Sequence, residues 1–311
     1  MAILLNNNGF DNASWQETLT ELLPAMPVYC FPDIPDPEEI KYALVWNHPH
    51  GDLRNYPNLQ AILILGAGTE HLDSDPGLPD VPVVRLIDPA VVNDMALYAL
   101  YWVTHFHRRY DDYRQQAQQR YWLAHDVCAT QDFRVTVLGL GEIGGPVAQR
   151  MALNGYKAQG WSRSQRQIDG VETYNGNCGL DIVLQRTDVL VNCLPLTEKT
   201  YHFLHEHNLS LLPAGACIIN LGRGATIDDK ALLALLDAGH LNGAALDTFA
   251  EEPLSAESPF WLHQNVHVTP HIAGNAYARS AAKVIVTNIQ KLELGELPFP
   301  MHVPPQHQQK N

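Results

Sequence analysis

A glycine-rich turn near the middle of the chain constrains the fold more than any other feature. It reads Gly139-Leu140-Gly141-Glu142-Ile143-Gly144, between the apolar run Val135–Leu138 and the helical pattern Pro146–Asn154. The spacing G-x-G-x-x-G between a strand and a helix is typical of a turn that holds a dinucleotide pyrophosphate. Gly139 permits the tight turn, Gly141 lets the backbone approach phosphate, and Gly144 allows close helix–strand packing. The alternative is a glycine-rich turn that only packs.

Short apolar runs alternate with helical patterns on both sides of this turn. Continuous apolar strands separated by helices predict an α/β fold with parallel sheets covered on both faces. The predicted strands are Ala2–Leu5, Val28–Cys30, Ala43–Trp46, Ala61–Leu65, Val83–Leu86, Val135–Leu138, Ala158–Trp161, Val189–Leu194, Cys217–Leu221, Gly243–Leu246 and Val266–Thr269. The predicted helices are Ser14–Leu23, Val91–Tyr113, Pro146–Asn154, Leu180–Gln185, Asn208–Leu212, Asp228–Ala238 and Ala276–Leu294.

Two of these helices and the C-terminal tail carry finer expectations. Ser14 followed by Glu17 predicts a capping box at the first helix. The helix Val91–Tyr113 is apolar on most faces, so we expect it to be buried. The tail from Pro298 is rich in proline and polar residues, and we expect it to be loose or an arm.

Length and charge restrict the function classes. A chain of 311 residues suits two domains. The net charge is 20 − 34 = −14, and an acidic chain without basic runs is a poor partner for nucleic acid or an anionic membrane. The N-terminal stretch lacks the features of a signal peptide and no apolar run has membrane-spanning length, so a cytoplasmic location is expected.

The cysteines and histidines do not predict a metal site. The five cysteines form no C-x-x-C pair, and Cys193 and Cys217 lie in apolar runs that predict buried free thiols. The densest histidine clusters are His48-Pro49-His50 and His205-Glu206-His207. Neither has a zinc-binding spacing, so we interpret these histidines as surface residues and expect no metal.

The residues after the second strand of the dinucleotide unit indicate which dinucleotide binds. An NAD site places Asp or Glu there to hold the ribose hydroxyls, whereas this chain has Ser162-Arg163-Ser164, with Arg166 nearby. A hydroxyl and a guanidinium can bind a 2′-phosphate through charge-assisted hydrogen bonds. We therefore expect NADP(H) to be preferred over NAD(H). The alternative is that both arginines lie on a solvated loop.

Three further stretches, together with the glycine turn, resemble one family. They are Asn220-Leu221-Gly222-Arg223-Gly224, the run from Asp247 to Leu254, and Thr269-Pro270-His271-Ile272-Ala273-Gly274. Their order and spacing resemble the D-isomer-specific 2-hydroxyacid dehydrogenases over nearly the whole chain. The resemblance implies an enzyme with catalytic residues Arg223, Glu252 and His271.

The chemistry of a 2-oxoacid reduction accounts for these residue types. The carbonyl carbon receives a hydride from the nicotinamide, and its oxygen needs a proton that His271 can supply near neutral pH. Glu252 would accept from the other ring nitrogen and favour imidazolium, and Arg223 would bind carboxylate and polarise the carbonyl. The alternatives are a helix cap for Arg223, an ordinary loop acid for Glu252 and a core histidine for His271.

The resemblance also implies contacts with cofactor and substrate. Asp247 ends a strand where nicotinamide should lie and is expected to contact the cofactor rather than to catalyse. In the stretch Leu65-Gly66-Ala67-Gly68, the amides of Ala67 and Gly68 match those that hold the substrate carboxylate, and Trp46 is expected either to wall the pocket or only to pack. The expected cofactor contacts are Gly139, Gly141, Glu142, Ile143, Gly144, Ser162, Arg163, Ser164, Leu194, Pro195, Leu221, Gly222 and Asp247.

Several stretches resemble the bacterial glyoxylate/hydroxypyruvate reductase A branch of this family. They include Tyr42–Trp46, Arg108–Arg114 and Trp161-Ser162-Arg163. The branch reduces glyoxylate and hydroxypyruvate with NADPH. The family implies two doubly wound parallel-sheet domains: a Rossmann cofactor domain, residues 96–274, inserted in a flavodoxin-like substrate domain, residues 1–95 plus 275–311. It also implies a homodimer formed through the cofactor domain.

Two other functions stay open at this stage. One is an NAD-dependent dehydrogenase of a larger D-2-hydroxyacid, against which Ser162-Arg163 argues. The other is a non-catalytic nucleotide-sensing protein on the same fold, as in the C-terminal-binding corepressors. The intact set of Arg223, Glu252 and His271 favours an enzyme.

Overall fold

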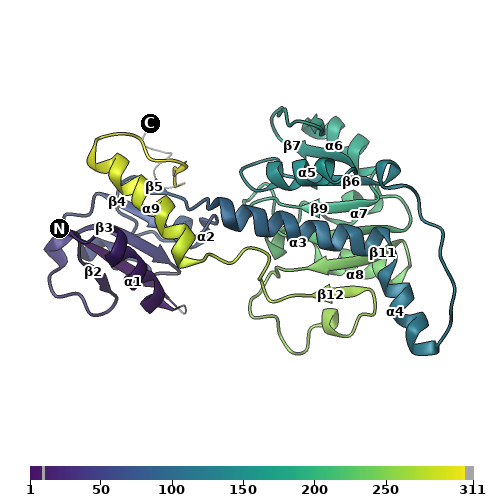
Figure 1. Ribbon diagram of the computed structural model, residues 1–311, viewed down its shortest axis with the longest axis horizontal. Helices are drawn as coiled ribbons and strands as arrows, with labels where there is room; N and C mark the ends of the chain where they lie inside the picture. Colours follow the sequence, from purple (N-terminus) through teal and green to yellow (C-terminus); the bar gives the residue numbers. More distant parts are fainter. Residues whose placement is uncertain (9–10, 305–311) are drawn as a thin grey trace. The chain divides into compact units, whose positions relative to one another are not determined.

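The computed structural model describes residues 1–8 and 11–304, and the chain divides into two units. Unit 1 is Met1–Val91 together with the chain from Asn275 on, and unit 2 is Val92–Gly274 (Figure 1). The boundary expected at residue 95 falls inside helix α3 (Pro89–His107). Unit 1 is thus built from both ends of the chain, and unit 2 from its middle.

Unit 2 has, within the described residues, a seven-stranded sheet in the order β12-β11-β10-β9-β6-β7-β8. All its neighbouring strands are parallel. Counted from the first strand of the unit, the order is 7-6-5-4-1-2-3, which is the Rossmann order with one added strand. The strands are β6 (Arg134–Leu138), β7 (Lys157–Ser162), β8 (Glu172–Asn175), β9 (Val189–Asn192), β10 (Ala216–Asn220), β11 (Leu241–Leu246) and β12 (Val266–Val268).

Helices cover this sheet because its strands are apolar on both faces. β9 and β10 are buried at every position. The core on one face joins Leu190 and Ile218 of these strands to Leu180, Leu209 and Leu232 of three helices. The helices of unit 2 after α3 are α4 (Tyr110–Gln119), α5 (Gly144–Leu153), α6 (Gly176–Leu184), α7 (Glu206–Ser210) and α8 (Asp229–Asp237).

Unit 1 contains, among its described residues, a six-stranded sheet in the order β13-β5-β4-β3-β1-β2. The first five strands along the chain are parallel in the flavodoxin-like order 2-1-3-4-5. The expected two-domain α/β fold is therefore confirmed. The strands are β1 (Ala2–Asn7), β2 (Val28–Cys30), β3 (Ile40–Trp46), β4 (Ala61–Ile64), β5 (Val83–Val84) and β13 (Met301–His302), and the helices of this unit outside α3 are α1 (Asn12–Leu22), α2 (Glu70–Asp73) and α9 (Ala278–Glu293).

The strand β13 corrects two expectations. It pairs antiparallel with β5, so the sheet of unit 1 is not wholly parallel. The tail is also not loose over its described part, because Asn288 of α9 donates to Phe299 O and accepts from Phe299 N. Proline and polar content misled the prediction, since a short edge pairing needs few apolar residues. The expectation for residues 305–311 lies outside the described residues.

The helix expected over Val91–Tyr113 is wrong in two respects. The structure has α3 and α4 instead, separated at Arg108 and Arg109, and Arg109 has a φ of 58°. A left-handed residue ends a helix, and no glycine or proline marks this break in the sequence. The helix is also not buried all round, because Leu97 and Tyr101 are exposed.

The capping prediction and two burial predictions also need correction. Asp11, not Ser14, caps α1, with its side chain accepting from Ala13 N. His48 is buried rather than at the surface, and it pairs with Asp75. Cys217 is buried as expected, but Cys193 is only half-buried. Burial raises the pKa of the Cys217 thiol to about 12, so it remains protonated at neutral pH.

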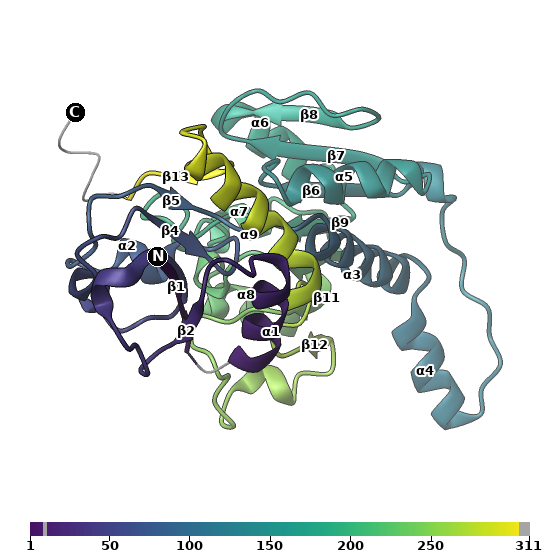
Figure 2. The same cartoon turned by 60° about the vertical axis from the view of Figure 1, so that its left-hand side comes forward.

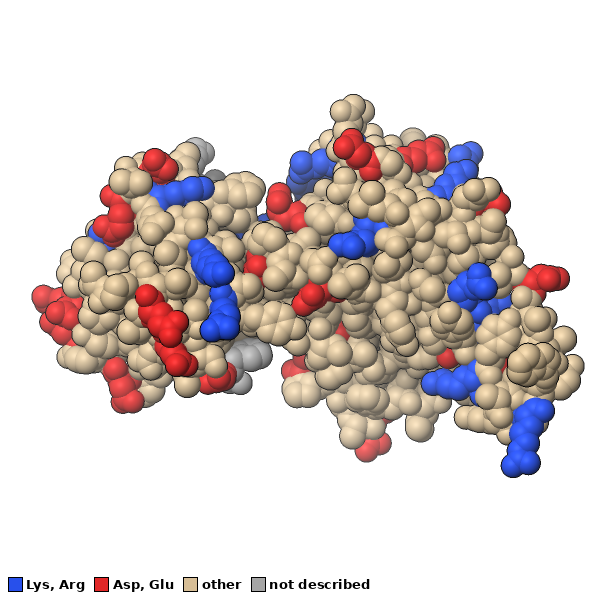
Figure 3. Space-filling model, viewed as in Figure 1, with Lys and Arg blue, Asp and Glu red and all other residues tan. Residues whose placement is uncertain are grey.

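The surface carries charges of both signs. On the face drawn in Figure 3, lysines and arginines are scattered among acidic and uncharged side chains. Among the described residues, no helix is both long and apolar enough to cross a membrane.

Candidate active site

The glycine turn joins β6 to α5, and its three glycines have three different surroundings. Gly139 has a φ of +89° and donates its amide hydrogen to Trp161 O at 2.8 Å. A Cβ on Gly144 would lie 1.8 Å from Gly139 O, so only glycine fits there. A Cβ on Gly141 would meet nothing within 4 Å. The turn is therefore tight inside and open at Gly141, as the approach of a pyrophosphate requires.

The next cofactor-directed residues follow β7. Ser162 ends that strand and donates its hydroxyl to Ser164 O at 2.6 Å. Arg163 and Arg166 are exposed. In the described part of the chain, no hydrogen bond or ion pair engages either guanidinium. The guanidinium groups of Arg163 and Arg166, without a partner among the described residues, thus lie close in sequence to Ser162, whose hydroxyl is bonded within its own loop.

Two buried asparagines organise the ends of β9 and β10. Asn192 Nδ2 donates to Asn220 Oδ1 at 2.9 Å and to Thr226 Oγ1 at 2.7 Å. Asn192 Oδ1 accepts from Leu194 N, and Asn220 Oδ1 also accepts from Gly222 N. This network holds the loops that carry the expected contacts Leu194, Pro195, Leu221 and Gly222.

Asp247, at the end of β11, lies inside the protein and organises the next loop. Its carboxylate is 1% exposed and accepts from Thr269 Oγ1 at 2.6 Å and from Ile272 N and Ala273 N at 2.9 Å each. His271 N also donates to Asp247 O at 2.9 Å. Asp247 therefore anchors the whole segment around His271.

Glu252 and His271 are brought together as an acid–imidazole pair. Glu252 Oε2 lies 2.8 Å from His271 Nδ1, and Glu252 Oε1 accepts from Phe249 N at 3.0 Å. The His271 side chain is 43% exposed, so it is no core histidine, and its Nε2 makes no hydrogen bond to another described residue. The backbone of His271 is left-handed, with a φ of 54°, which sets the ring's direction.

The charge state of Glu252 suits this pairing. Burial would raise the pKa of its carboxyl, but hydrogen bonds from His271 and Phe249 N and the charges of His271 and Arg223 lower it below its usual value. A carboxyl with a lowered pKa is ionised at neutral pH. The attraction it contributes is present above its usual pKa and is lost as pH falls through the lowered value.

Arg223 follows β10 and precedes the 3₁₀ turn Gly224–Thr226. Its Nη1 donates to Gly222 O at 3.0 Å, and its backbone carbonyl accepts from the Thr226 hydroxyl. Its positive charge helps to lower the pKa of the Glu252 carboxyl. A Cβ on Gly224 would lie 1.9 Å from Phe249 C, so the chain after Arg223 packs tightly on the Glu252 segment. The fold thus assembles Arg223, Glu252 and His271 at the carboxyl end of the sheet, where ligands of parallel α/β sheets bind.

The residues expected to bind substrate through unit 1 are Trp46, which ends β3, and Ala67 and Gly68, which follow β4. Neither Ala67 N nor Gly68 N donates to another described residue, whereas Ala67 O accepts from Arg85 Nε at 2.8 Å. Trp46 lies so close to Gly66 that a Cβ there would be 2.5 Å from the indole. His71 also packs against Trp46, with ring centroids 4.8 Å apart. Unit 1 therefore has two backbone N–H groups that donate no hydrogen bond to a described residue, in the same unit as a closely packed tryptophan.

Comparison with known proteins decides the family. The model of the D-isomer specific 2-hydroxyacid dehydrogenase NAD-binding domain matches residues 100–273. The chain belongs to this family. It is 36% identical over 304 residues to glyoxylate/hydroxypyruvate reductase A of Serratia proteamaculans (strain 568), a match that covers 96% of this chain and 97% of that protein.

Solved structures of this dehydrogenase family have the same fold. A D-isomer specific 2-hydroxyacid dehydrogenase from Xanthobacter autotrophicus Py2, in complex with NADPH and MES, matches with a TM-score of 0.95 and 36% identity, over 98% of this chain and 99% of that one. The NADPH-dependent glyoxylate/hydroxypyruvate reductase from Sinorhizobium meliloti, in complex with NADP and sulfate, matches with a TM-score of 0.91 and 33% identity, over 97% and 98%.

Sequence reasoning missed the buried residues that hold the loops of this dehydrogenase site in place. Asn192 and Thr226 were not singled out and Asn220 was named only as the start of a motif, although Asn192 and Asn220 each end a wholly apolar run. A buried polar residue at that position needs partners, and its partners are the neighbouring strand ends. An asparagine that closes a buried strand was the available signal.

The glycine turn supports a prediction that separates packing from ligand binding. Gly144→Ala should lower the free energy of unfolding by at least about 2 kcal/mol, because the new methyl overlaps backbone. Gly141→Ala, its matched control, should change it by less than about 1 kcal/mol, because the space is open. Urea unfolding measures both, and titration with the dinucleotide should show weakened binding in the Gly141 variant. Equal stability of the two variants would contradict this account of the turn.

Proposed function

We propose that this chain uses NADPH to reduce small 2-oxoacids, glyoxylate to glycolate and hydroxypyruvate to D-glycerate. The observation that carries the proposal is the pair formed by Glu252 and His271, which leaves one imidazole nitrogen available for a substrate. The printed descriptions of the relatives from Serratia and Sinorhizobium support the substrate class.

The proposed chemistry divides between cofactor and protein. Bound NADPH supplies the hydride, and the remaining steps belong to side chains. His271 donates a proton from Nε2 to the carbonyl oxygen as negative charge develops there. Glu252, held by Phe249 N, keeps Nδ1 protonated and favours the imidazolium form. Arg223 binds the substrate and stabilises the developing charge.

The proposed NADPH preference rests on the loop after β7. Arg163 and Arg166 have no described protein partner, and no carboxylate occupies the strand end at Ser162. A 2′-phosphate would meet two guanidinium groups there instead of a repelling acid. The NADPH and NADP complexes of the relatives support this preference. In the same proposal the backbone of Glu142 and Ile143 and the open space beside the Gly141 Cα face the pyrophosphate.

The strand-end loops complete the proposed cofactor site. Leu194, Pro195, Leu221 and Gly222 would contact the nucleotide from loops held by the asparagine network. The carboxylate of Asp247 is already engaged by the loop Thr269–Ala273. It would therefore serve the cofactor by holding that loop.

Unit 1 supplies the proposed carboxylate-binding groups. The amides of Ala67 and Gly68 donate to no described residue and would bind the substrate carboxylate. Trp46, held against Gly66 and His71, would exclude long side chains and so favour short oxoacids.

The direct test is a substrate panel with NADPH oxidation as the readout. Glyoxylate and hydroxypyruvate should be reduced with higher kcat/KM than pyruvate or larger oxoacids. Preference for a larger oxoacid with NADH would point to an NAD-dependent dehydrogenase. No turnover with any oxoacid, combined with tight nucleotide binding, would point to a nucleotide-sensing protein.

The cofactor preference is tested at Arg163. Arg163→Ala should lower kcat/KM for NADPH about tenfold or more, because a charge-assisted hydrogen bond to the 2′-phosphate is lost, and should leave the value for NADH nearly unchanged. Arg186→Ala, which removes an arginine after α6, is the control for general loss of positive charge. An equal loss with both cofactors would show that Arg163 acts elsewhere.

The proton donor is tested by two variants. His271→Ala should lower kcat for reduction about 10²–10⁴-fold while NADPH binding changes little. Glu252→Gln removes the charge that favours imidazolium, so the pH at which kcat/KM for reduction falls should shift downward. A profile that keeps its midpoint in the Glu252→Gln variant would remove Glu252 from this role.

The oligomeric proposal is a homodimer formed through unit 2. The segment 121–129 after α4 has no regular structure, and in both views it runs outside the sheet of unit 2, from the far end of α4 back toward β6 (Figures 1 and 2). It carries Tyr121 and Leu123 on either side of Trp122, whose surface is 99% exposed. A projecting apolar segment of this kind is typical of a subunit contact.

Sedimentation measures this contact. The protein should sediment as a dimer, and Trp122→Ser should shift the equilibrium toward monomer. Trp261→Ser, which removes another exposed tryptophan of unit 2, should not. A monomeric wild-type protein would overturn the proposal.

A further inference from the structure

Three metal-ligating side chains converge in unit 2, and the proposed reaction uses none of them. They are His105 at the end of α3, Asp111 in the first turn of α4, and His267 in β12. We propose that they form a binding site for one divalent transition-metal ion of the Zn²⁺ class. The sequence analysis expected no metal because the densest histidine clusters lack a zinc-binding spacing, and these three residues are scattered along the chain.

The geometry centres both imidazoles on a single carboxylate. His105 Nε2 lies 2.9 Å and His267 Nε2 lies 2.8 Å from the same atom, Asp111 Oδ2. The donor atoms of all three residues lie within 4.8 Å of one another. The two rings meet edge to face, with centroids 5.0 Å apart and an interplanar angle of 75°. The nitrogens therefore approach one point from different directions, as the ligands of one ion do.

The surrounding residues hold this arrangement in place. Trp102 packs on both rings, with centroids 5.1 Å from His105 and 4.6 Å from His267. The left-handed Arg109 separates α3 from α4, and Asp111 in the first turn of α4 contacts His105. The side chains of His105 and His267 are only 11% and 12% exposed. Little conformational freedom remains for an ion to remove, which favours binding.

The second oxygen of the Asp111 carboxylate also suits a cation. Arg114 approaches Asp111 Oδ1 at 3.4 Å but is 65% exposed, and Oδ1 accepts no hydrogen bond from the described residues. Arg109 is paired with Asp112 instead, at 2.6 Å.

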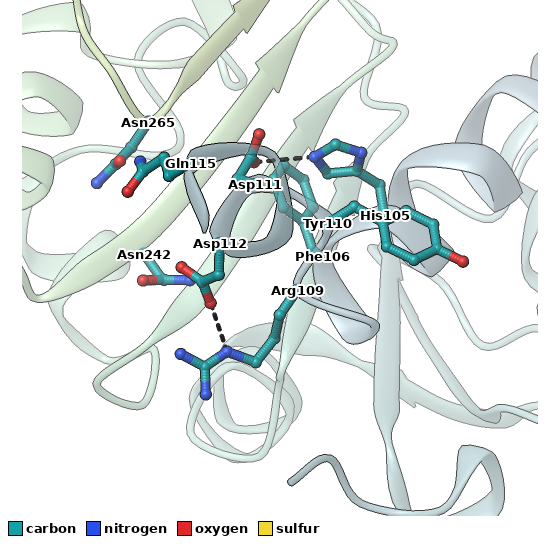
Figure 4. Close-up of a pocket in the computed structure, with 9 residues that line it drawn as sticks. All are labelled: His105, Phe106, Arg109, Tyr110, Asp111, Asp112, Gln115, Asn242 and Asn265. Atoms are coloured by element: carbon teal, nitrogen blue, oxygen red, sulfur yellow. Dashed lines mark hydrogen bonds and ion pairs between the residues drawn. The ribbon is translucent and has the colours of Figure 1, made fainter. Parts of the chain in front are cut away.

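Room for the ion and its remaining ligand is present. Zinc bonds to nitrogen and oxygen are about 2.0–2.2 Å, which separates tetrahedral ligand atoms by roughly 3.3 Å. The two Nε2–Oδ2 distances, now 2.9 and 2.8 Å, would have to lengthen by about half an ångström. An ion would then replace the protons shared between the imidazoles and the carboxylate. A pocket of about 40 Å³ adjoins His105 and Asp111 and could hold a water ligand. The neutral side chains Gln115, Asn242 and Asn265 line it (Figure 4).

Bound metal would link three segments that are otherwise joined by hydrogen bonds. It would fix the start of α4 to α3 and to the edge strand β12. The ion would therefore be structural, and its binding is expected to raise the melting temperature.

Calorimetric titration of the metal-free, tag-free full chain with Zn²⁺ tests the site. Wild type should bind one ion per chain with a Kd in the micromolar range or below. His105→Gln and His267→Gln should each weaken binding about 10–100-fold, because glutamine can still donate to Asp111 but does not replace an imidazole ligand. His207→Gln, which removes an exposed histidine of α7, is the matched control and should bind like wild type.

Two results would overturn the proposal: wild type that binds no Zn²⁺ below about 100 μM, or both glutamine variants binding like wild type. If a variant does not fold, Co²⁺ bound to wild type decides the question. Strong visible absorption that Zn²⁺ removes supports a low-coordinate nitrogen-containing site, and weak absorption typical of hydrated Co²⁺ contradicts it. Because these readouts are binding, spectrum and melting temperature, they do not depend on the proposed reductase activity.

Discussion

The buried carboxylate of Asp247 is the constraint on which the site in unit 2 depends. It accepts three hydrogen bonds from the segment after β12, while its backbone carbonyl accepts a fourth from His271. A carboxylate this deeply buried is costly unless its partners are all in place, so the loop has one favourable conformation. That conformation puts the imidazole of His271 beside Glu252.

The same principle governs the neighbouring strand ends. Asn192 and Asn220 satisfy each other and the backbone of the next loops, and Thr226 links them to Arg223. The loops after β9 and β10 are thereby held in mutual register by polar side chains that have no access to water. The proposed ligand contacts lie in these loops, whereas the side chains that hold the loops in place, Asn192, Asn220 and Thr226, are buried beneath them.

The sequence was sufficient for the fold where local chemistry is unambiguous. Continuous apolar strands and the glycine turn predicted both sheets, and the ordered motifs singled out Arg223, Glu252 and His271, which the fold brings close together. It was insufficient where a long-range contact decides the conformation. Nothing near Arg109 indicates a left-handed residue, because the break is stabilised by Asp111 meeting His267 from 156 positions away. Likewise β13 pairs through main-chain atoms with β5, and those carry no sequence signal.

The construction of unit 1 from both chain ends has a consequence for synthesis on the ribosome. One face of its core packs Ile3, Trp15 and Leu19 against Ala282, Ile285 and Ile289 of α9. The N-terminal strands therefore emerge first but cannot bury that face until nearly the whole polypeptide has been made. The middle of the chain meets no such delay, since its sheet is complete once β12 has emerged. A nascent chain thus passes through a period in which its leading segment exposes apolar surface that the finished fold buries.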